Sequence, residues 1–354
     1  MKVYLPQTIA TPLTVIQRER VLPVAGEILV REGERVEPIQ VIGQANLPMD
    51  RRVVNVARVL GLSPAAVGKA LKVKSGQKVK RGQVLAAVRW PNKRVCRAPI
   101  DGVVTDGGGG WLLIEAPPQE FELRANLYGT ISRVVAGWGV VIRTHGALIQ
   151  GAWGNGKEGS GVLKVLIKER DKPLRGRSID ATCRGTVLIG GGWLDKDALE
   201  KAVEMQVRGI ITGGLSPDAL TAAEEMAFPI VVTEALGDAP MCPRIHHLLM
   251  AHDGREATLD ARFRTGWEVV RPEVIVPLPA EGAAEALPDA NLELKVGDVV
   301  RGVRAPYLGI TGVVVAFPSW ARTASGAQMA AARVKRDDDE QIMTIPLVNL
   351  EILR

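Results

Sequence analysis

Hydrophobic and polar positions in the first third of the chain alternate in short runs that end at glycines, which predicts short β-strands joined by tight turns. The runs contain an internal repeat, in which REGERVEPIQVI (31–42) matches KSGQKVKRGQVL (74–85) at a constant offset of 43 residues. Gly33 thereby pairs with Gly76, and Val36 with Val79. Each copy is typical of two strands around a bend that glycine supplies. Two copies predict one unit with a pseudo-twofold axis.

The segment after the second copy repeats a pattern of strand, glycine-rich turn and strand, in RAPIDGVVTDGGGGWLLIEAP (97–117). VKSGQKVKRGQVL followed by APIDGVV resembles the barrel-sandwich hybrid of biotinyl and lipoyl domains over roughly residues 20–120. The resemblance implies such a β-fold for residues 1–126. Apolar residues at helical spacing predict a pair of helices inserted at 49–70, with a break at 61–64.

The lysine that biotinyl and lipoyl domains modify lies at a hairpin tip between those two motifs. Here the hairpin VRWPNKRVCR (88–97) is shorter and lacks the usual residues around its lysine. Lys93 beside Pro91 and Asn92 is typical of a solvated turn. We therefore expect no swinging-arm carrier and no cofactor.

Residues 127–180 alternate β-branched residues with glycines and predict a small all-β element. Within it, Gly151 to Lys157 satisfy the G-x-x-x-x-G-K spacing of a phosphate-binding loop. The next residue is Glu158, where that loop needs a hydroxyl for Mg²⁺, and a carboxylate there repels phosphate. A glycine-rich hairpin is the favoured interpretation.

Residues 181–276 change to alternating strands and helices and predict an α/β unit with a parallel sheet. Asp195 and Ser216 are expected to cap the first two helices. The predicted strands are 186–192, 208–214, 228–238 and 255–261, and the predicted helices are 194–207, 216–228 and 241–254.

Parallel sheets bind ligands at the carboxyl ends of their strands, where glycine lets a ligand approach the backbone. Three loops of the α/β unit converge at that edge and predict a site for a small anionic ligand. The favoured interpretation is that these glycines only serve turns, and the ligand site is the alternative. The strand-TGG-helix portion loosely resembles the DRTGG domain. The candidate ligand-binding residues are Gly191, Gly192, Thr212, Gly213, Gly214, Thr233, Glu234 and Gly237.

Residues 277–291 are rich in alanine, proline and acids and predict a linker. The stretch VGDVVRGVRAPYLGITGVVV and the strand IPLVNLEIL resemble a KOW or SH3-like barrel over residues 292–354. That resemblance implies RNA or protein as a partner, and the acidic run 337–340 favours protein. The expected fold class is a multidomain α+β chain.

Over its whole length the chain is similar to an uncharacterised bacterial family that combines the lipoyl-like repeat with the segments 146–158 and 233–241. The family implies the domain order and no reaction.

The composition and the cysteine spacing predict the cell compartment and the state of the thiols. No run approaches the length of a membrane-spanning helix, and the start of the chain lacks the pattern of a signal peptide, so we expect a cytoplasmic protein without a membrane partner. Cys96, Cys183 and Cys242 are far apart and odd in number, so buried, reduced thiols are expected. Cys242 with His246 and His252 would make a poor metal site within one short segment, so no metal is expected.

Charge is concentrated in one stretch. The chain has a net charge of +6, residues 266–354 are net acidic, and residues 69–97 hold ten Lys or Arg and no acid. The candidate basic surface consists of Lys72, Lys74, Lys78, Lys80, Arg81, Arg89, Lys93, Arg94 and Arg97.

No Ser-His-Asp or Cys-His arrangement is supported by residue spacing in the sequence, so we predict no catalytic residue. The favoured hypothesis is a non-enzymatic interaction or scaffold protein, whose basic lipoyl-like module and acidic KOW-like module dock macromolecular partners, with a protein partner expected first and nucleic acid as a further candidate. One alternative is an enzyme or sensor that holds an anionic metabolite in the α/β crevice. Another is a nucleic-acid-binding protein that uses residues 69–97.

Overall fold

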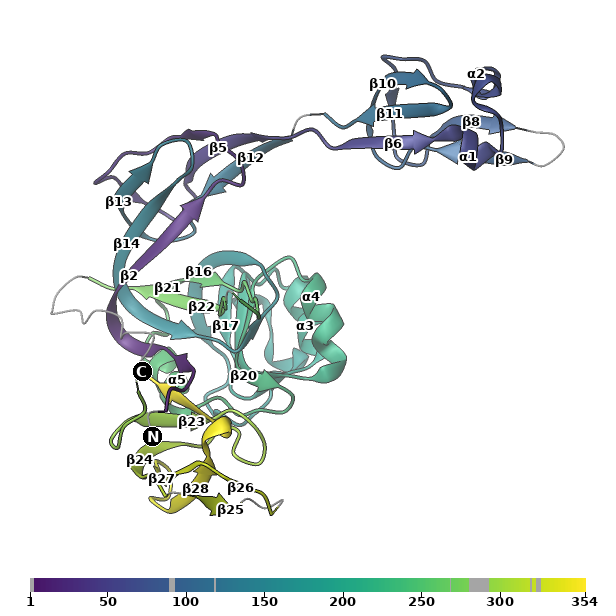
Figure 1. The fold of residues 1–354 in the computed structure, drawn as a ribbon. Coiled ribbons are helices and arrows are strands. Elements are labelled where there is room, and N and C mark those ends of the chain that lie inside the picture. The colour runs from purple at the N-terminus through teal and green to yellow at the C-terminus, as the bar shows by residue number, and fades with distance from the viewer. Residues whose placement is uncertain are drawn as a thin grey trace.

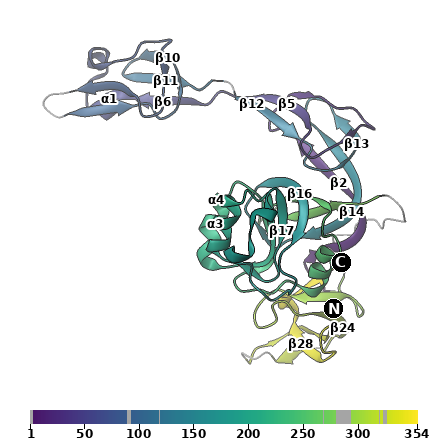
Figure 2. The same ribbon diagram turned by 180° about the vertical axis from the view of Figure 1, so that it is seen from behind.

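The structure, a computed structural model, describes residues 3–88, 93–117, 119–267, 269–279, 293–318, 320–322 and 326–354. Strands take up 46% and helices 14% of the chain, so the protein is mostly β with several sheets. Both views show three parts: a globular centre, a small sheet below it, and a module that stands away from both (Figures 1 and 2).

The centre is built on one large sheet, in which four neighbouring strands are parallel. Three of the four are strands predicted for the α/β unit and confirm its parallel arrangement, whereas the fourth predicted strand, at 255–261, pairs antiparallel, so the prediction is wrong for it. The fourth parallel strand belongs to the predicted all-β element, through which the same sheet continues. In spatial order the strands are β15 (Trp153–Gly154), β20 (Ile230–Leu236), β19 (Gly209–Leu215), β17 (Thr186–Ile189), β16 (Glu158–Val165), β21 (Glu256–Asp260), β22 (Glu273–Pro277), β14 (Gly139–Gln150), β13 (Gly129–Val135) and β4 (Arg35–Val36), with β18 (Trp193–Leu194) on β19 and β2 (Ala10–Val21) on β14.

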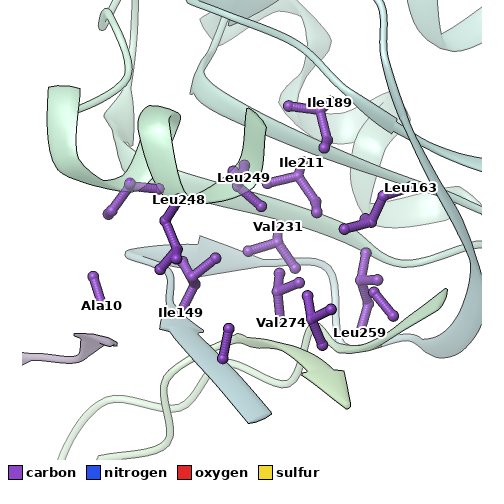
Figure 3. Packing of buried hydrophobic residues seen from close by; sticks show 14 of the residues in the cluster. Ala10, Ile149, Leu163, Ile189, Ile211, Val231, Leu248, Leu249, Leu259 and Val274 are labelled. Carbon is purple, nitrogen blue, oxygen red and sulfur yellow. The ribbon is translucent and has the colours of Figure 1, made fainter. Parts of the chain in front are cut away.

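Helices cover the parallel strands on both faces. α3 (Lys196–Glu204) and α4 (Leu220–Glu225) pack on one core, which includes Leu188 and Ile210. α5 (Pro243–Met250) packs Leu248 and Leu249 on the other face, against side chains such as Val231 (Figure 3). Strand side chains alternate between faces, so each buried strand supplies both cores.

The two predicted helix caps differ. The Asp195 carboxylate accepts a hydrogen bond from the backbone N–H of Ala198 at 2.9 Å, which confirms it as the cap of α3. Ser216 precedes a 3₁₀ turn, and its hydroxyl bonds the side chain of Asp218 rather than a helix amide. The prediction of a side-chain cap at Ser216 is therefore wrong, because a nearer acceptor competes for the hydroxyl.

The module that stands apart is inserted between two paired strands, β5 (Val41–Leu47) and β12 (Gln119–Arg124), which form a sheet with β3 (Glu27–Ile28). Its own core includes Val79, Leu85 and Ile114. We call residues 51–115 the basic module. It contains β6 (Arg51–Asn55), α1 (Val56–Leu60), α2 (Val67–Ala70), β7 (Lys78–Val79), β8 (Val84–Val88), β9 (Arg94–Arg97), β10 (Gly102–Gly108) and β11 (Trp111–Glu115).

The helical insertion predicted at 49–70 is correct only from Val56 onward. Residues 51–55 form strand β6, which pairs with β11 through contacts such as Val54 opposite Leu112. That cross-strand partner lies more than fifty residues away in the sequence, so local helical spacing could not reveal it.

The repeat builds the same local structure twice, in two different cores. Gly33 and Gly76 both have φ of 83°, and each donates its N–H to a strand that lies beside it, to Ile131 O at 2.8 Å and Val104 O at 2.6 Å. Val36 belongs to a core with Ile131, whereas Val79 belongs to the core of the basic module. The two copies therefore do not share the single pseudo-twofold unit that the repeat suggested.

The remaining sheet joins the two ends of the described chain. β1 (Gln7–Thr8) pairs in parallel with β29 (Leu350–Leu353), so the sheet predicted from the C-terminal residues also takes a strand from the N-terminal part. Its core includes Val300, Val314 and Ile352. The sheet order is β1, β29, β23 (Val299–Gly302), β24 (Thr311–Ala316), β27 (Ala331–Arg336) and β28 (Ile342–Pro346), beside a separate pair of β25 (Ala321–Arg322) and β26 (Gln328–Met329).

Candidate functional site

The basic module concentrates the positive charge of the protein. Its sequence holds thirteen Lys or Arg and three Asp or Glu, a surplus of ten. The whole chain has a net charge of only +6, so the rest carries a surplus of four acidic residues. A basic lobe is thus joined to a mildly acidic body.

The cations predicted to form a basic surface are exposed where the structure describes them. None of the eight forms an ion pair with a described residue. Arg89 lies outside the described residues. The eight exposed residues are Lys72, Lys74, Lys78, Lys80, Arg81, Lys93, Arg94 and Arg97.

Two of the module's three carboxylates have partners elsewhere. Glu115 forms an ion pair with Arg51 at 2.8 Å. Asp101 accepts a hydrogen bond from the backbone N–H of Arg81 at 2.5 Å. No ion pair among the described residues involves a side chain of the basic surface, so the charge of that surface is available to a partner.

The glycines of the predicted ligand crevice accommodate the chain's own backbone. A Cβ added at Gly191 would lie 1.9 Å from the carbonyl oxygen of Glu169, and one added at Gly214 would lie 2.1 Å from that of Gly237. At Gly213 the added atom would meet the backbone N of Met241 at 2.6 Å. Close backbone packing therefore accounts for these residues, and Gly192 likewise approaches residues 171–172. The ligand site at this edge stays a prediction.

The predicted polar contacts of that crevice are buried and bonded within the protein. The Thr212 hydroxyl donates to the carbonyl of Gly192 at 2.7 Å, and the Thr233 hydroxyl donates to Glu234 at 3.1 Å. The other carboxylate oxygen of Glu234 lies 3.1 Å from Arg301. Glu234 is thus one member of a buried ion cluster.

Arg301 holds that cluster together at the junction of three elements. Its guanidinium lies 3.1 Å from both Glu234, at the end of β20, and Glu351, on β29. It also donates to the Thr8 hydroxyl of β1 at 3.0 Å, and Arg271 contacts Glu351 from the other side. Burial lowers the pKa of Arg301, but the two carboxylates outweigh burial and keep the pKa above its usual value. We call these residues the charged joint.

Sequence reasoning missed the charged joint because its members are distant in the sequence. Glu234 and Glu351 lie 67 and 50 residues from Arg301, and Thr8 lies 293 residues from it. The only local signal is an arginine between apolar strand residues in VVRGV. An arginine at such a position is expected to find a buried partner.

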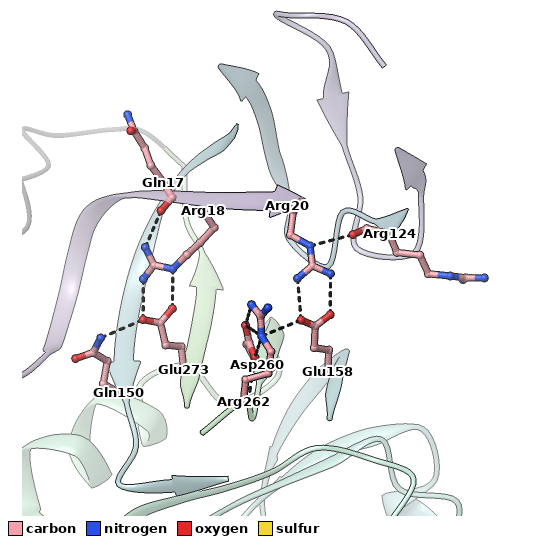
Figure 4. A network of polar contacts seen from close by, with 9 residues as sticks. All are labelled: Gln17, Arg18, Arg20, Arg124, Gln150, Glu158, Asp260, Arg262 and Glu273. Carbon is pink, nitrogen blue, oxygen red and sulfur yellow. Dashed lines mark hydrogen bonds and ion pairs between the residues drawn. The ribbon is translucent and has the colours of Figure 1, made fainter. Parts of the chain in front are cut away.

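A second polar network fastens β2 to the centre (Figure 4). Arg18 binds Glu273 through two hydrogen bonds of 2.7 and 2.8 Å, and Arg20 binds Glu158 through two of 2.7 Å. Both arginines lie on the same face of β2, two residues apart. Arg262 adds a contact of 3.2 Å to Glu158, and its hydrogen bond to Asp260 raises its own pKa. Glu158, the residue that interrupts the apparent phosphate-loop pattern, is therefore an ion-pair partner at the start of a strand.

The three cysteines and His252 are buried, and His246 is half-buried. All three cysteines are free and buried, as expected from their spacing. Burial and the charge of Glu234 raise the pKa of Cys242 to about 11, so its thiol stays protonated near neutral pH and is a poor nucleophile. Burial lowers the pKa of both His246 and His252. Within the described ranges, no three His, Cys, Asp or Glu side chains gather as metal ligands would.

Comparison with known proteins does not assign the chain to a family. No family model matches the chain, and no curated protein is significantly similar to it. The resemblances to biotinyl and lipoyl domains, to KOW barrels and to an uncharacterised bacterial family stay predictions. None of the helices described is both long and apolar enough to span a membrane.

Proposed function

We propose that this protein is a non-enzymatic docking protein that holds an acidic protein partner on its basic module. The observation that carries the proposal is the surplus of ten positive charges on residues 51–115, with the predicted basic side chains exposed and without ion pairs in the described structure. Complementary charge steers association and selects partners of opposite sign. The rest of the protein, in which the charged joint connects the large sheet to the sheet of β1 and β29, serves as the rigid support.

Nucleic acid is the second candidate partner, because a lobe with this charge density can displace the counterions of a phosphate backbone. The described part of the module exposes one large aromatic ring, Trp111, at 48%. Single-stranded nucleic acid is usually held by stacking on several aromatic side chains, so a duplex is the nucleic acid this surface suits better.

We further infer that the two repeat units are barrel-sandwich hybrids and that the six-stranded sheet of β1, β23, β24, β27, β28 and β29 is an SH3-like barrel. The matching turns at Gly33 and Gly76, each bonded to a neighbouring strand, support the first assignment. The antiparallel order β29, β23, β24, β27, β28 supports the second. Both folds commonly serve binding, which agrees with a docking role.

The test measures binding of the full chain to three probes, polyglutamate, duplex DNA and single-stranded RNA, at low and moderate salt. The variant carries Lys74→Gln, Lys78→Gln and Lys80→Gln on the module. The control carries Lys157→Gln, Lys168→Gln and Lys172→Gln on the body, which removes the same charge from exposed positions.

Binding of polyglutamate that the module variant loses and the control keeps supports the acidic protein partner. Tighter binding of duplex DNA, with affinity that falls steeply with salt, transfers the assignment to nucleic acid. No binding to any probe by the unchanged chain at low salt overturns the docking role.

A further inference from the structure

A cleft outside the basic module lies where the first repeat copy meets the large sheet. Its volume is about 550 Å³, within the range of small-molecule sites. Polar side chains from three neighbouring strands line it, and Leu278 and Pro279 add an apolar wall. The polar residues that matter are Arg35, Tyr128, Thr130, Arg143 and His145.

The strand register places the two arginines of the cleft on either side of one residue, Thr130. Arg35 of β4 lies opposite Thr130 of β13, and Thr130 lies opposite Arg143 of β14. Directly opposed residues project from the same face of a sheet, and neighbouring strands lie about 4.8 Å apart. The two arginines therefore flank Thr130 across roughly 10 Å of backbone, a span that two guanidinium groups can close over a single ligand group. His145 lies two residues after Arg143 on the same face.

Neither arginine is neutralised by the described protein. Both are exposed, and neither forms an ion pair with a described carboxylate. Among the residues that line the cleft, Glu37 is the one acid beside the two arginines, and a second acid, Glu256, contacts the lining Tyr128. Burial, a hydrogen bond to Glu256 and the charge of Glu37 raise the pKa of Tyr128 to about 12, which keeps its hydroxyl protonated.

The second repeat copy provides an internal comparison. Its equivalent row is Lys78, Val103 and Glu115, by the same pairing across β7, β10 and β11. There the third position is an acid that is paired with Arg51 at 2.8 Å. The first copy has a hydroxyl and an unpaired arginine at the corresponding positions. The positive row is thus particular to the first copy and is not required by the fold.

We propose that this cleft binds a phosphate monoester, with Arg35 and Arg143 on its terminal oxygens and Thr130 beneath. A phosphate monoester has three terminal oxygens, enough for two arginine forks and a hydroxyl, whereas a carboxylate has two. The apolar wall at Leu278 and Pro279 would contact the organic part of the ligand. This site is independent of the docking function of the basic module.

The test titrates the full chain with phenyl phosphate, inorganic phosphate and benzoate by calorimetry. We expect phenyl phosphate to bind more tightly than either of the others. Arg143→Gln should weaken its binding at least about tenfold, the effect expected of a lost charge-assisted hydrogen bond. Arg35→Gln is a second variant at an exposed position and should weaken it similarly.

The controls are Arg133→Gln, at an exposed position on β13, and Lys157→Gln, at an exposed position on the body that does not line the cleft. Both should bind phenyl phosphate like the unchanged chain. Benzoate binding as tight as that of phenyl phosphate would overturn the phosphate assignment. An unchanged chain that binds none of the three, or arginine variants that bind as well as it does, would overturn the site itself.

Discussion

The described cations of the basic surface on this module are exposed and form no ion pair with a described residue, whereas Arg301 in the charged joint is 1% exposed and lies between two glutamates. The same kinds of side chain therefore have opposite consequences. Mutual repulsion in the module costs stability and leaves charge for a partner, while the pairing in the joint ties β1, β20 and β23 together. Binding surface and structural support are kept in separate parts of the chain.

The largest expected effect comes from breaking the joint. Arg301→Met removes the cation between Glu234 and Glu351 and leaves buried carboxylates without it. We expect a loss of about 3–5 kcal/mol in the free energy of unfolding, measured by urea denaturation. Arg304→Met, at an exposed position three residues on, is the matched control. A loss below about 1 kcal/mol would show that the joint behaves like a surface pair.

The next effect tests whether the basic module has a stability of its own. Leu85 is fully buried in the module core, so Leu85→Ala should cost about 2–5 kcal/mol. Hydrogen exchange should rise across residues 51–115 and stay unchanged in the strands β17, β19 and β20. Val53→Ala, at a position 62% exposed, should change neither. Faster exchange in both regions would mean that the module and the body unfold together.

Added salt should have a smaller effect, and it should stabilise the basic module more than the rest of the protein. Raising NaCl from about 0.05 to 0.5 M screens the repulsion among the exposed cations, so hydrogen exchange in residues 51–115 should slow. The free energy of unfolding of the module should rise by no more than about 1 kcal/mol, as for other interactions between surface charges. The variant with Gln at positions 74, 78 and 80 should show a smaller gain. Equal responses with and without those lysines would contradict the idea of stored repulsion.

The smallest effect concerns pH. Burial and nearby Arg255 lower the pKa of His252 in the folded protein, while in the unfolded chain it titrates near about 6.5. As pH falls through that value the unfolded state takes up the proton more readily, so stability falls between about pH 7 and 5. His252→Leu should reduce this slope in thermal unfolding, with a remainder from His246, whose pKa is also lowered. His247→Leu, at an exposed position, should change the slope less than His252→Leu, because the charge of His247 acts only through the lowered pKa of His246.

Local patterns were sufficient for the elements of the parallel sheet and for the turns of the repeat. Strands β17, β19 and β20 are short apolar runs with glycine or proline at or near their ends, and α3 begins after a capping aspartate, so each carries its signal within a few residues. Strand β6 was not predicted from local pattern, because its partner β11 lies at the other end of the module's sequence. The basic surface was also found locally, since it needs only a count of charges.

By itself the sequence determined the repeat, its glycine turns and the concentration of positive charge, because these depend on residues close together along the chain. Tertiary structure alone decided that the two repeat copies belong to different cores, that β1 joins β29, and that Arg301 meets Glu234 and Glu351. Those contacts join residues tens to hundreds of positions apart, and many alternative pairings satisfy the same local pattern. The sequence predicted the basic surface, and the structure showed that it lies on a module with its own hydrophobic core.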